Sequence, residues 1–140
     1  MDNPHNNEVH KLEYSWTLWY HDPDDKNWDI NSYKKLIKFS TLEEFLKYYD
    51  LIKTFIYGMF FLMKEDILPI WEDKNNINGG IMTYKILKET SDQSFIDLSM
   101  LLVGGTLTDE YKYINGISLS PKINNCIIKR LLSQISNLNN

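Results

Sequence analysis

The stretch at residues 67–76, Ile-Leu-Pro-Ile-Trp-Glu-Asp-Lys-Asn-Asn, limits the possible folds more than any other part of the sequence. Pro69 fixes its own φ angle and disfavours a helical conformation for the residue before it. The preceding apolar run is therefore expected to be extended. Trp71 and Glu72 then lie at the start of a polar loop that the glycine pair at 79–80 closes.

An indole next to a carboxylate, on a loop between two strands, suits a flat cationic ligand. The ring of Trp71 offers a π face, and Glu72 offers acceptor oxygens. The alternative is that Trp71 fills a core while Glu72 is solvated. On this stretch alone, both interpretations stay open.

Composition indicates one globular domain and limits its partners. The chain has 140 residues, 43% of them hydrophobic, which is enough for a core of its own. A single cysteine, Cys126, excludes a disulfide framework and a multi-cysteine zinc site. The net charge of -4 argues against broad electrostatic binding along a nucleic-acid backbone, but it allows recognition of one nucleotide.

The start of the chain and the missing motifs bear on location and activity. Residues 1–9 are expected to form a flexible arm, and residues 10–140 a single domain. We find no signal-peptide pattern and no apolar run long enough to span a membrane, which predicts a cytoplasmic protein. Without a phosphate-binding glycine loop, a nucleophile elbow or a cluster of metal ligands, we predict a binding module and not an enzyme, with no cofactor and no metal.

Apolar periodicity predicts an α+β fold. Strands are expected at residues 14–20, 32–39, 60–64, 81–87 and 113–119. Helices are expected after a capping box of Ser40 with Glu43 or Thr41 with Glu44, from residues 90–92 to the glycines at 104–105, and from Ser120-Pro121 onward. Short links that permit antiparallel pairing predict helices packed on one face of a curved sheet.

The second expected helix is apolar on two sides. One stripe would face the sheet and consists of Phe95, Leu98 and Leu102. The other consists of Ile96, Met100 and Val103. A protein partner could cover this second stripe, and a neighbouring loop or the N-terminal arm could do so equally well.

Several short stretches occur together in one order. They are His-Lys-Leu at 10–12, Trp-Thr-Leu-Trp-Tyr at 16–20, Lys-Asn-Trp at 26–28, the segment 39–45, Pro-Ile-Trp-Glu-Asp at 69–73 with the glycine pair, and Leu-Leu-Val-Gly at 101–104. Together they resemble the family of eukaryotic translation initiation factor 4E, the messenger-RNA cap-binding protein. The resemblance implies a curved antiparallel β-sheet with helices on the convex face and a cap slot on the concave face.

The resemblance also implies a role for each residue of the slot. Trp28 and Trp71 match the two indoles that sandwich 7-methylguanine. Methylation at N7 gives the base a positive charge, so the stacking is a cation–π interaction. Glu72 matches the carboxylate that accepts hydrogen bonds from the guanine N1–H and N2–H₂ groups, and the backbone N–H of Trp71 would serve O6.

The phosphate contacts of the family are harder to match. Lys122 is a loose match to the phosphate-binding basic residue, and a solvated position in the first turn of the last helix is the alternative. Lys129 and Arg130 receive no phosphate role. Because the chain is expected to pass directly into that helix, the family's next strand and its final strands are expected to be missing, which gives a C-terminally shortened domain.

On the convex face the resemblance implies a site for an initiation factor 4G-like scaffold or a repressor protein. The positions that fit are His10, Leu12, Leu42, Ile96, Asp97, Met100 and Gly104, and Leu46 is the one predicted position that departs from the pattern. Leu46 stands where the family has an indole. The prediction is thus a monomeric cap-binding protein of translation initiation. The alternative is a decoy or repressor that keeps the convex surface and has weak or no cap affinity.

Overall fold

The computed structural model describes residues 9–47, 58–107 and 111–133. The elements are β1 (Lys11–His21), η2 (Ile30–Ser32), β2 (Lys34–Thr41), α1 (Leu42–Lys47), β3 (Met59–Lys64), β4 (Gly80–Ile86), η3 (Lys88–Thr90), α3 (Ser91–Val103), η4 (Tyr111–Tyr113), β5 (Ile114–Pro121) and β6 (Cys126–Leu132). Every predicted strand is present at its place in the chain. The predicted N-terminal arm, apart from Val9, lies outside the described residues.

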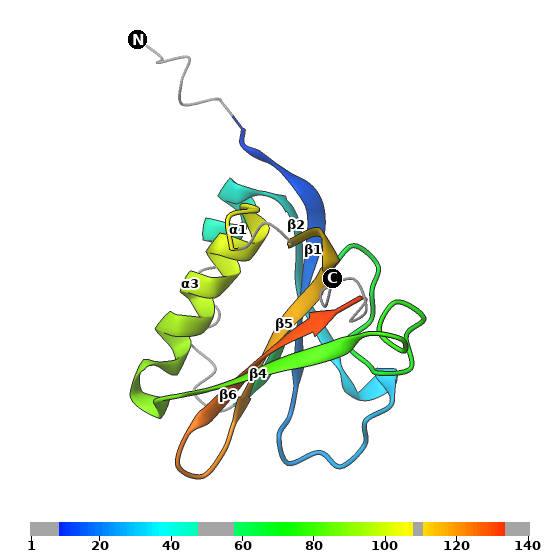
Figure 1. Cartoon of the computed structure of the whole chain (residues 1–140), viewed down its shortest axis with the longest axis vertical. Helices are drawn as coiled ribbons and strands as arrows, with labels where there is room; N and C mark the ends of the chain where they lie inside the picture. The colour runs from blue at the N-terminus through cyan, green and yellow to red at the C-terminus, as the bar shows by residue number, and fades with distance from the viewer. Residues whose placement is uncertain (1–8, 48–57, 108–110, 134–140) are drawn as a thin grey trace, which may run out of the picture.

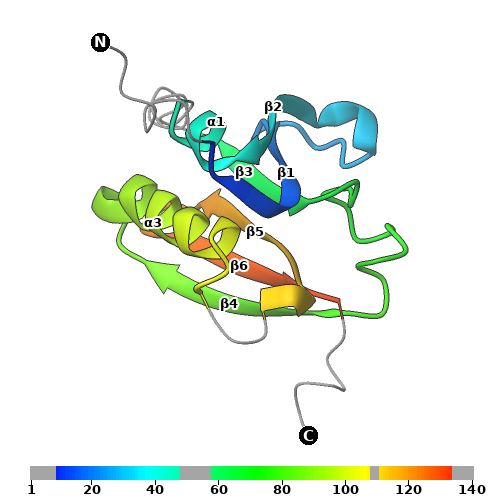
Figure 2. The same cartoon turned by 90° about the horizontal axis from the view of Figure 1, so that it is seen from above.

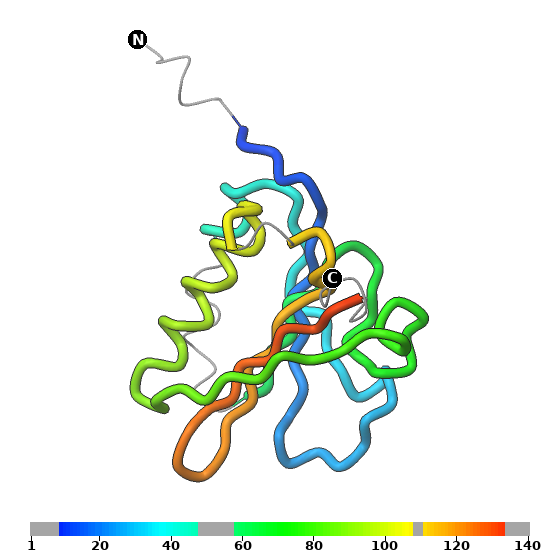
Figure 3. The backbone as a smooth tube through the Cα atoms, in the orientation of Figure 1, coloured from blue at the N-terminus to red at the C-terminus, as the bar shows by residue number. Residues whose placement is uncertain are grey.

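The strands form one six-stranded sheet in the order β2-β1-β3-β5-β6-β4, and every neighbouring pair is antiparallel (Figure 1). The pairing register shifts between Leu18 and Trp19 in β1 and between Ile114 and Gly116 in β5. Such irregularities increase the local twist of a sheet. The strands accordingly twist across one another along the backbone trace (Figure 3).

Strand β1 distributes its side chains to two faces of the sheet. Trp16 and Leu18 belong to the main core, whereas Trp19 belongs to a second cluster with Phe61 and Met63. Alternation of this kind is what an extended chain requires. The face that carries Trp16 is called the helix face below, and the face that carries Trp19 is called the loop face.

Helices α1 and α3 cover the helix face (Figure 2). Helix α3 contributes Phe95 and Leu102, which are fully buried against the sheet. Gly105 follows the helix with a φ of 74°, a left-handed conformation that glycine adopts without a steric penalty. This confirms the predicted α+β class with helices on one face of a curved antiparallel sheet. Within the described residues, no helix has the length and apolar character needed to cross a membrane.

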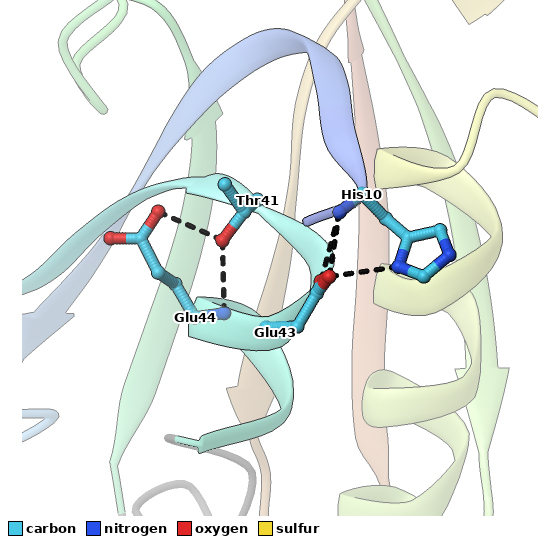
Figure 4. Close-up of polar contacts among 4 residues, drawn as sticks. All are labelled: His10, Thr41, Glu43 and Glu44. Carbon is cyan, nitrogen blue, oxygen red and sulfur yellow. Dashed lines mark hydrogen bonds and ion pairs between the residues drawn. The ribbon is translucent and has the colours of Figure 1, made fainter. Parts of the chain in front are cut away.

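The capping box at the start of α1 is the one between Thr41 and Glu44. The hydroxyl of Thr41 accepts a hydrogen bond from the backbone N–H of Glu44 at 3.1 Å and donates one to its carboxylate at 3.0 Å (Figure 4). The backbone N–H of Ser40 donates to the same carboxylate at 3.2 Å. These bonds lower the pKa of Glu44 below its ordinary value, and the bond from the Ser40 backbone has the largest effect.

The helix predicted from Ser120-Pro121 onward is wrong. The chain makes a turn, in which the N–H of Lys122 donates to the carbonyl of Asn125 at 2.8 Å, and returns as strand β6. Positions 123, 127 and 131 are four apart, which fits one face of a helix but equally one face of a strand, because four is also a multiple of two. The buried residues of β6 alternate, which is the strand period: Cys126, Ile128 and Leu132. The strand that was expected to be missing is therefore present.

Candidate functional site

The loop between β1 and β2 is organised by its own side chains. The carboxylate of Asp22 accepts a hydrogen bond from the N–H of Asp24 at 2.9 Å, and Asp25 accepts one from the N–H of Asn27 at 2.8 Å. Such contacts satisfy backbone donors locally and give a polar loop a defined path. Trp28 follows directly, and 48% of its surface is exposed.

The indole of Trp28 rests on a buried histidine. Its ring is stacked on His21 with centroids 4.0 Å apart and planes inclined by 8°. Tyr33 borders both rings, with its centroid 4.7 Å from that of His21 and 6.4 Å from that of Trp28. Tyr33 in turn packs edge-on against Phe61 at 5.4 Å. One face of Trp28 is thus backed by protein, and its exposed surface lies away from His21.

The loop that carries Trp71 is built around Asp73. Its carboxylate accepts hydrogen bonds from the N–H of Leu68 at 2.8 Å and the N–H of Asn75 at 2.7 Å, one on each side of Trp71 in the chain. Its backbone carbonyl accepts the N–H of Asn76 at 2.8 Å. Pro69 is buried beneath the turn. The predicted polar loop is confirmed by the turns at residues 71–78, whereas strand β3 ends at Lys64, so residues 67–70 are not part of a strand.

Two buried amides join this loop to the sheet. The side-chain NH₂ of Asn76 donates to the carbonyls of Leu68 at 3.0 Å and Ile70 at 2.8 Å. The NH₂ of Asn115 on β5 donates to the carbonyl of Asn75 at 2.7 Å and to the amide oxygen of Asn76 at 2.9 Å. Both side chains are 2% exposed, so the network is shielded from water. The loop is consequently held to β5 by specific hydrogen bonds.

Trp71 and Glu72 are both presented to solvent. Trp71 is 49% exposed, which excludes the alternative that it fills a core. Burial raises the pKa of Tyr33 above its ordinary value, and the negative charge of Glu72 raises it further. Glu72 therefore lies close enough to act on the ring that borders Trp28. Segments 22–33 and 65–79, which carry these residues, lie on the side of the sheet away from α3 (Figure 2).

Basic residues divide between the two faces. On β6, Lys129 pairs with Ser118, which pairs with Phe61, so Lys129 belongs to the loop face. Arg130 belongs to the helix face, where its guanidinium lies 5.3 Å from the centre of the Tyr84 ring. Lys35 extends over the Trp19 ring at 5.3 Å on the loop face.

Lys122 lies in the turn between β5 and β6, not in a helix. Its carbonyl accepts a hydrogen bond from the ammonium group of Lys88 at 2.9 Å, and its side chain is exposed. The interpretation as a residue of a first helical turn is therefore wrong. A phosphate role for Lys122 remains a prediction.

The predicted partner positions lie on helices α1 and α3 and at the start of strand β1. The backbone N–H and ring nitrogen Nδ1 of His10 lie 2.6 Å and 2.8 Å from the Glu43 carboxylate, which joins the start of β1 to α1 (Figure 4). A hollow of about 190 Å³ lies beside this contact, and His10, Leu12 and Leu42 are among the residues that line it. Asp97 is exposed and accepts a hydrogen bond from the Gln93 amide at 2.8 Å.

One partner position has to be corrected. Ile96 is fully buried in the main core, and Val103 is 3% exposed, so the second stripe of α3 is largely covered within the chain. A helix that turns 100° per residue brings both stripes near the sheet when the sheet curves around it. The exposed apolar residues of this region are Leu46 at 45%, Met100 at 39% and Leu101 at 43%.

Two residues of the site were not selected from the sequence. His21 continues the alternation of β1 on the same side as Trp19, which is the signal that could have placed it on the loop face. Asn115 is a buried polar residue between Ile114 and Gly116 in β5, and a buried amide of that type calls for hydrogen-bond partners. Neither signal names the partner, because His21 meets Trp28 and Asn115 meets the Trp71 loop only in three dimensions.

Comparison with known proteins gives this arrangement a family. The model of the family described as eukaryotic initiation factor 4E matches residues 11–137. The chain belongs to this family. It is 37% identical over 104 residues to eukaryotic translation initiation factor 4E-1 of Arabidopsis thaliana, with 69% of this chain and 44% of that protein covered. It is 33% identical over 126 residues to translation initiation factor 4E of Candida albicans, with 81% of this chain and 60% of that protein covered.

Solved structures of initiation factor 4E proteins share the fold. The Ascaris suum eIF4E-3 complex with an m7G cap has a TM-score of 0.81 and 25% identity, and the match covers 94% of this chain and 79% of that one. The complex of C. elegans eIF4E-3 with the 4E-binding protein Mextli and a cap analog has a TM-score of 0.83, 25% identity and the same coverage. The chain spans about half the length of the curated relatives, from 44% to 60% for the two named above.

Proposed function

We propose that the chain binds the 7-methylguanosine cap of messenger RNA as a translation initiation factor 4E-like protein. The observation that carries this proposal is the exposure of Trp28 at 48% and Trp71 at 49% on two loops that extend from the same face of the sheet. Half-exposed indoles of this kind are available for a ligand and are not needed for the core. Relatives of similar fold were solved with an m7G cap, which supports the same ligand for this chain.

The chemistry of the three residues fits the methylated base. The cationic 7-methylguanine would stack between Trp28 and Trp71, because an electron-rich indole face attracts a positive charge. Glu72 would accept hydrogen bonds from the guanine N1–H and N2–H₂ groups, and the backbone N–H of Trp71 would donate to O6. An unmethylated guanine lacks the charge and should bind less tightly.

The phosphates of the cap would be bound by lysines from separate parts of the chain. Lys122 keeps its proposed role as a phosphate contact from the β5–β6 turn. Lys129 is a second candidate, because the strand register places it on the loop face. Each would act as a flexible point charge in solvent, so its contribution should be small and sensitive to salt.

A second site is proposed on the helix face, for a scaffold of the initiation factor 4G kind or for a repressor protein. Two structural neighbours were solved with a protein partner, the 4E-binding protein Mextli in one and 4E-BP in a schistosome eIF4E complex that is 27% identical with a TM-score of 0.80. The exposed apolar side chains of Leu46, Met100 and Leu101 would receive an amphipathic helix. Leu46 has less area than an indole and no N–H donor, so the partner would need bulkier apolar side chains.

We further infer that the protein works as a monomer, by binding and without catalysis, and in the cytoplasm, where messenger RNA is translated. Within the described ranges, no group of three or more His, Cys, Asp or Glu side chains is placed to hold a metal ion. The exposed indole pair does not favour the alternative of a decoy without cap affinity.

A titration with cap nucleotides tests the proposal. Tryptophan fluorescence is followed while m7GTP, or GTP as the matched unmethylated control, is added to the purified chain. We expect m7GTP to bind about five- to thirtyfold more tightly, since a desolvated cation–π interaction is worth roughly 1–2 kcal/mol. Equal quenching by the two nucleotides would reject cap recognition.

A further inference from the structure

We propose that His21 is a positioning residue of the cap slot, whose stacked imidazole holds the Trp28 indole ready for the methylated base. The inference rests on the proposed cap-binding function. It concerns a buried side chain that makes no contact with the ligand itself and acts only through Trp28.

The first step is the stacking geometry. Trp28 extends from a loop rich in Asp and Asn, and 48% of its surface is exposed. An indole in such a place would be free to rotate unless something fixed its plane. His21 is 0% exposed, and its ring lies parallel to the indole within 8° at 4.0 Å. Tyr33, tilted at 55° to the imidazole, closes the same group of rings.

The second step is the position of the imidazole proton. Nε2 of His21 lies 2.7 Å from the backbone carbonyl of Asn27, and a carbonyl oxygen can only accept a hydrogen bond. Nε2 is also 3.1 Å from the hydroxyl of Ser32, which already donates its own proton to the carbonyl of Asp29 at 2.7 Å. Both neighbours therefore require a proton on Nε2. These bonds fix the plane of the imidazole against the loop that carries Trp28.

The third step concerns the other nitrogen. Nδ1 of His21 is buried and makes no hydrogen bond with any described residue. A second proton there would be buried without an acceptor, which is costly. The acceptors that the described residues offer to His21 therefore lie at Nε2 and not at Nδ1. The imidazole covers only one face of the Trp28 indole, which leaves the π electrons of the other face available to the cationic base.

The consequence is preorganisation. A ligand that meets an indole already in place does not have to pay the entropy of ordering it. Loss of the stacked ring should therefore weaken binding without removing any ligand contact. The value of an aromatic pair predicts a loss of about five- to tenfold in affinity.

The test compares wild type, His21→Leu and His21→Phe by m7GTP titration, with GTP alongside and thermal unfolding of each variant. Leucine fills the site without a flat ring, and phenylalanine restores the ring without the nitrogens. We expect His21→Leu to lose about five- to tenfold in m7GTP affinity. His21→Phe should recover most of it even if its thermal midpoint falls, which a purely structural role would not give.

The outcomes separate the two proposals. If wild type does not prefer m7GTP over GTP, the cap-binding function fails. If wild type does prefer m7GTP but His21→Leu binds it equally well, or His21→Phe is as weak as His21→Leu, the role of His21 is overturned. If a variant fails to fold, the proposal can still be tested by nuclear magnetic resonance on the wild type alone. In the ligand-free protein, nuclear Overhauser contacts between the His21 and Trp28 rings are expected, and their absence also overturns the inference.

Discussion

At the scale of single residues, Glu72 and Lys122 are expected to contribute unequally to the affinity of the candidate slot for the cap. Glu72 would serve two donors on one base edge, and its negative charge adds to burial in raising the pKa of Tyr33, the ring that borders Trp28. Lys122 lies on a turn whose backbone bonds run to Asn125 and Lys88, with its side chain in solvent. A carboxylate that reads a base edge is specific, whereas one surface ammonium group is a screened contact.

We predict that Glu72→Ala weakens m7GTP binding more than Lys122→Ala does. Loss of the acceptors leaves two guanine donors unsatisfied, at a cost of about 1–3 kcal/mol, or roughly five- to 150-fold in affinity. Lys122→Ala should cost at most about 1 kcal/mol and lose its effect in high salt. Calorimetry on both variants checks the ranking, with Glu89→Ala as a matched control for the loss of an exposed carboxylate. A larger loss for Lys122→Ala would contradict this assignment of the slot.

At the scale of elements, alternation and capping predicted most of the fold, and the failures have physical causes. Trp16, Leu18 and Trp19 could be assigned to two faces from the strand period alone. The last strand was mistaken for a helix because Ile127 and Leu131 satisfy both periods, and only its pairing with β4 and β5 decides between them.

The site was predictable to a similar extent. The order of the motifs predicts Trp28, Trp71 and Glu72 for the candidate site, but the sequence does not show which residues hold them in place. The contacts of His21 are with Asn27 and Trp28, 6 and 7 positions away in the chain. Those of Asn115 are with Asn75 and Asn76, 40 and 39 positions away. Ile96 was assigned to the surface because the sequence does not tell how far the sheet curves around α3.

We predict that Asn115→Ala loosens the Trp71 loop and weakens cap binding together. The change removes both hydrogen bonds to the loop and leaves the buried amide oxygen of Asn76 without that donor. The expected loss of stability is about 1–3 kcal/mol. Chemical denaturation, m7GTP titration and hydrogen exchange of the loop amides measure the three effects. Ser120→Ala, which removes a buried hydroxyl from the same strand, should leave the loop amides unchanged.

If Asn115→Ala destabilised the protein as a whole but bound m7GTP as well as wild type, the hydrogen bonds would support the fold without positioning Trp71. Faster exchange confined to residues 68–79, together with weaker binding, would show that the network holds the loop. The comparison with Ser120→Ala separates this local effect from a general loss of packing in β5.

At the scale of the whole molecule, one sheet separates two proposed binding surfaces. The main core and both helices lie on the helix face, whereas the cluster of Trp19, Phe61 and Met63 lies with the tryptophan loops on the loop face. A sheet together with the side chains on its two faces is ~10 Å thick, and changes that far apart usually act independently. The architecture therefore allows the cap and a protein partner to be bound at once.

We predict that Met100→Asp abolishes capture of a protein partner and leaves m7GTP affinity unchanged. Met100 is 39% exposed on α3, and a flexible thioether suits an adaptable apolar surface, so a carboxylate there should repel the apolar face of a partner helix. The matched control is Met82→Asp, which introduces the same charge at a methionine that is 44% exposed on β4, at the far edge of the sheet. The measurement is retention of a purified 4E-binding protein fragment on a cap resin loaded with each variant. Loss with Met100→Asp alone supports the site on α1 and α3. Equal retention by both variants would reject that site, and weaker m7GTP binding by Met100→Asp would show that the two faces are coupled through the sheet.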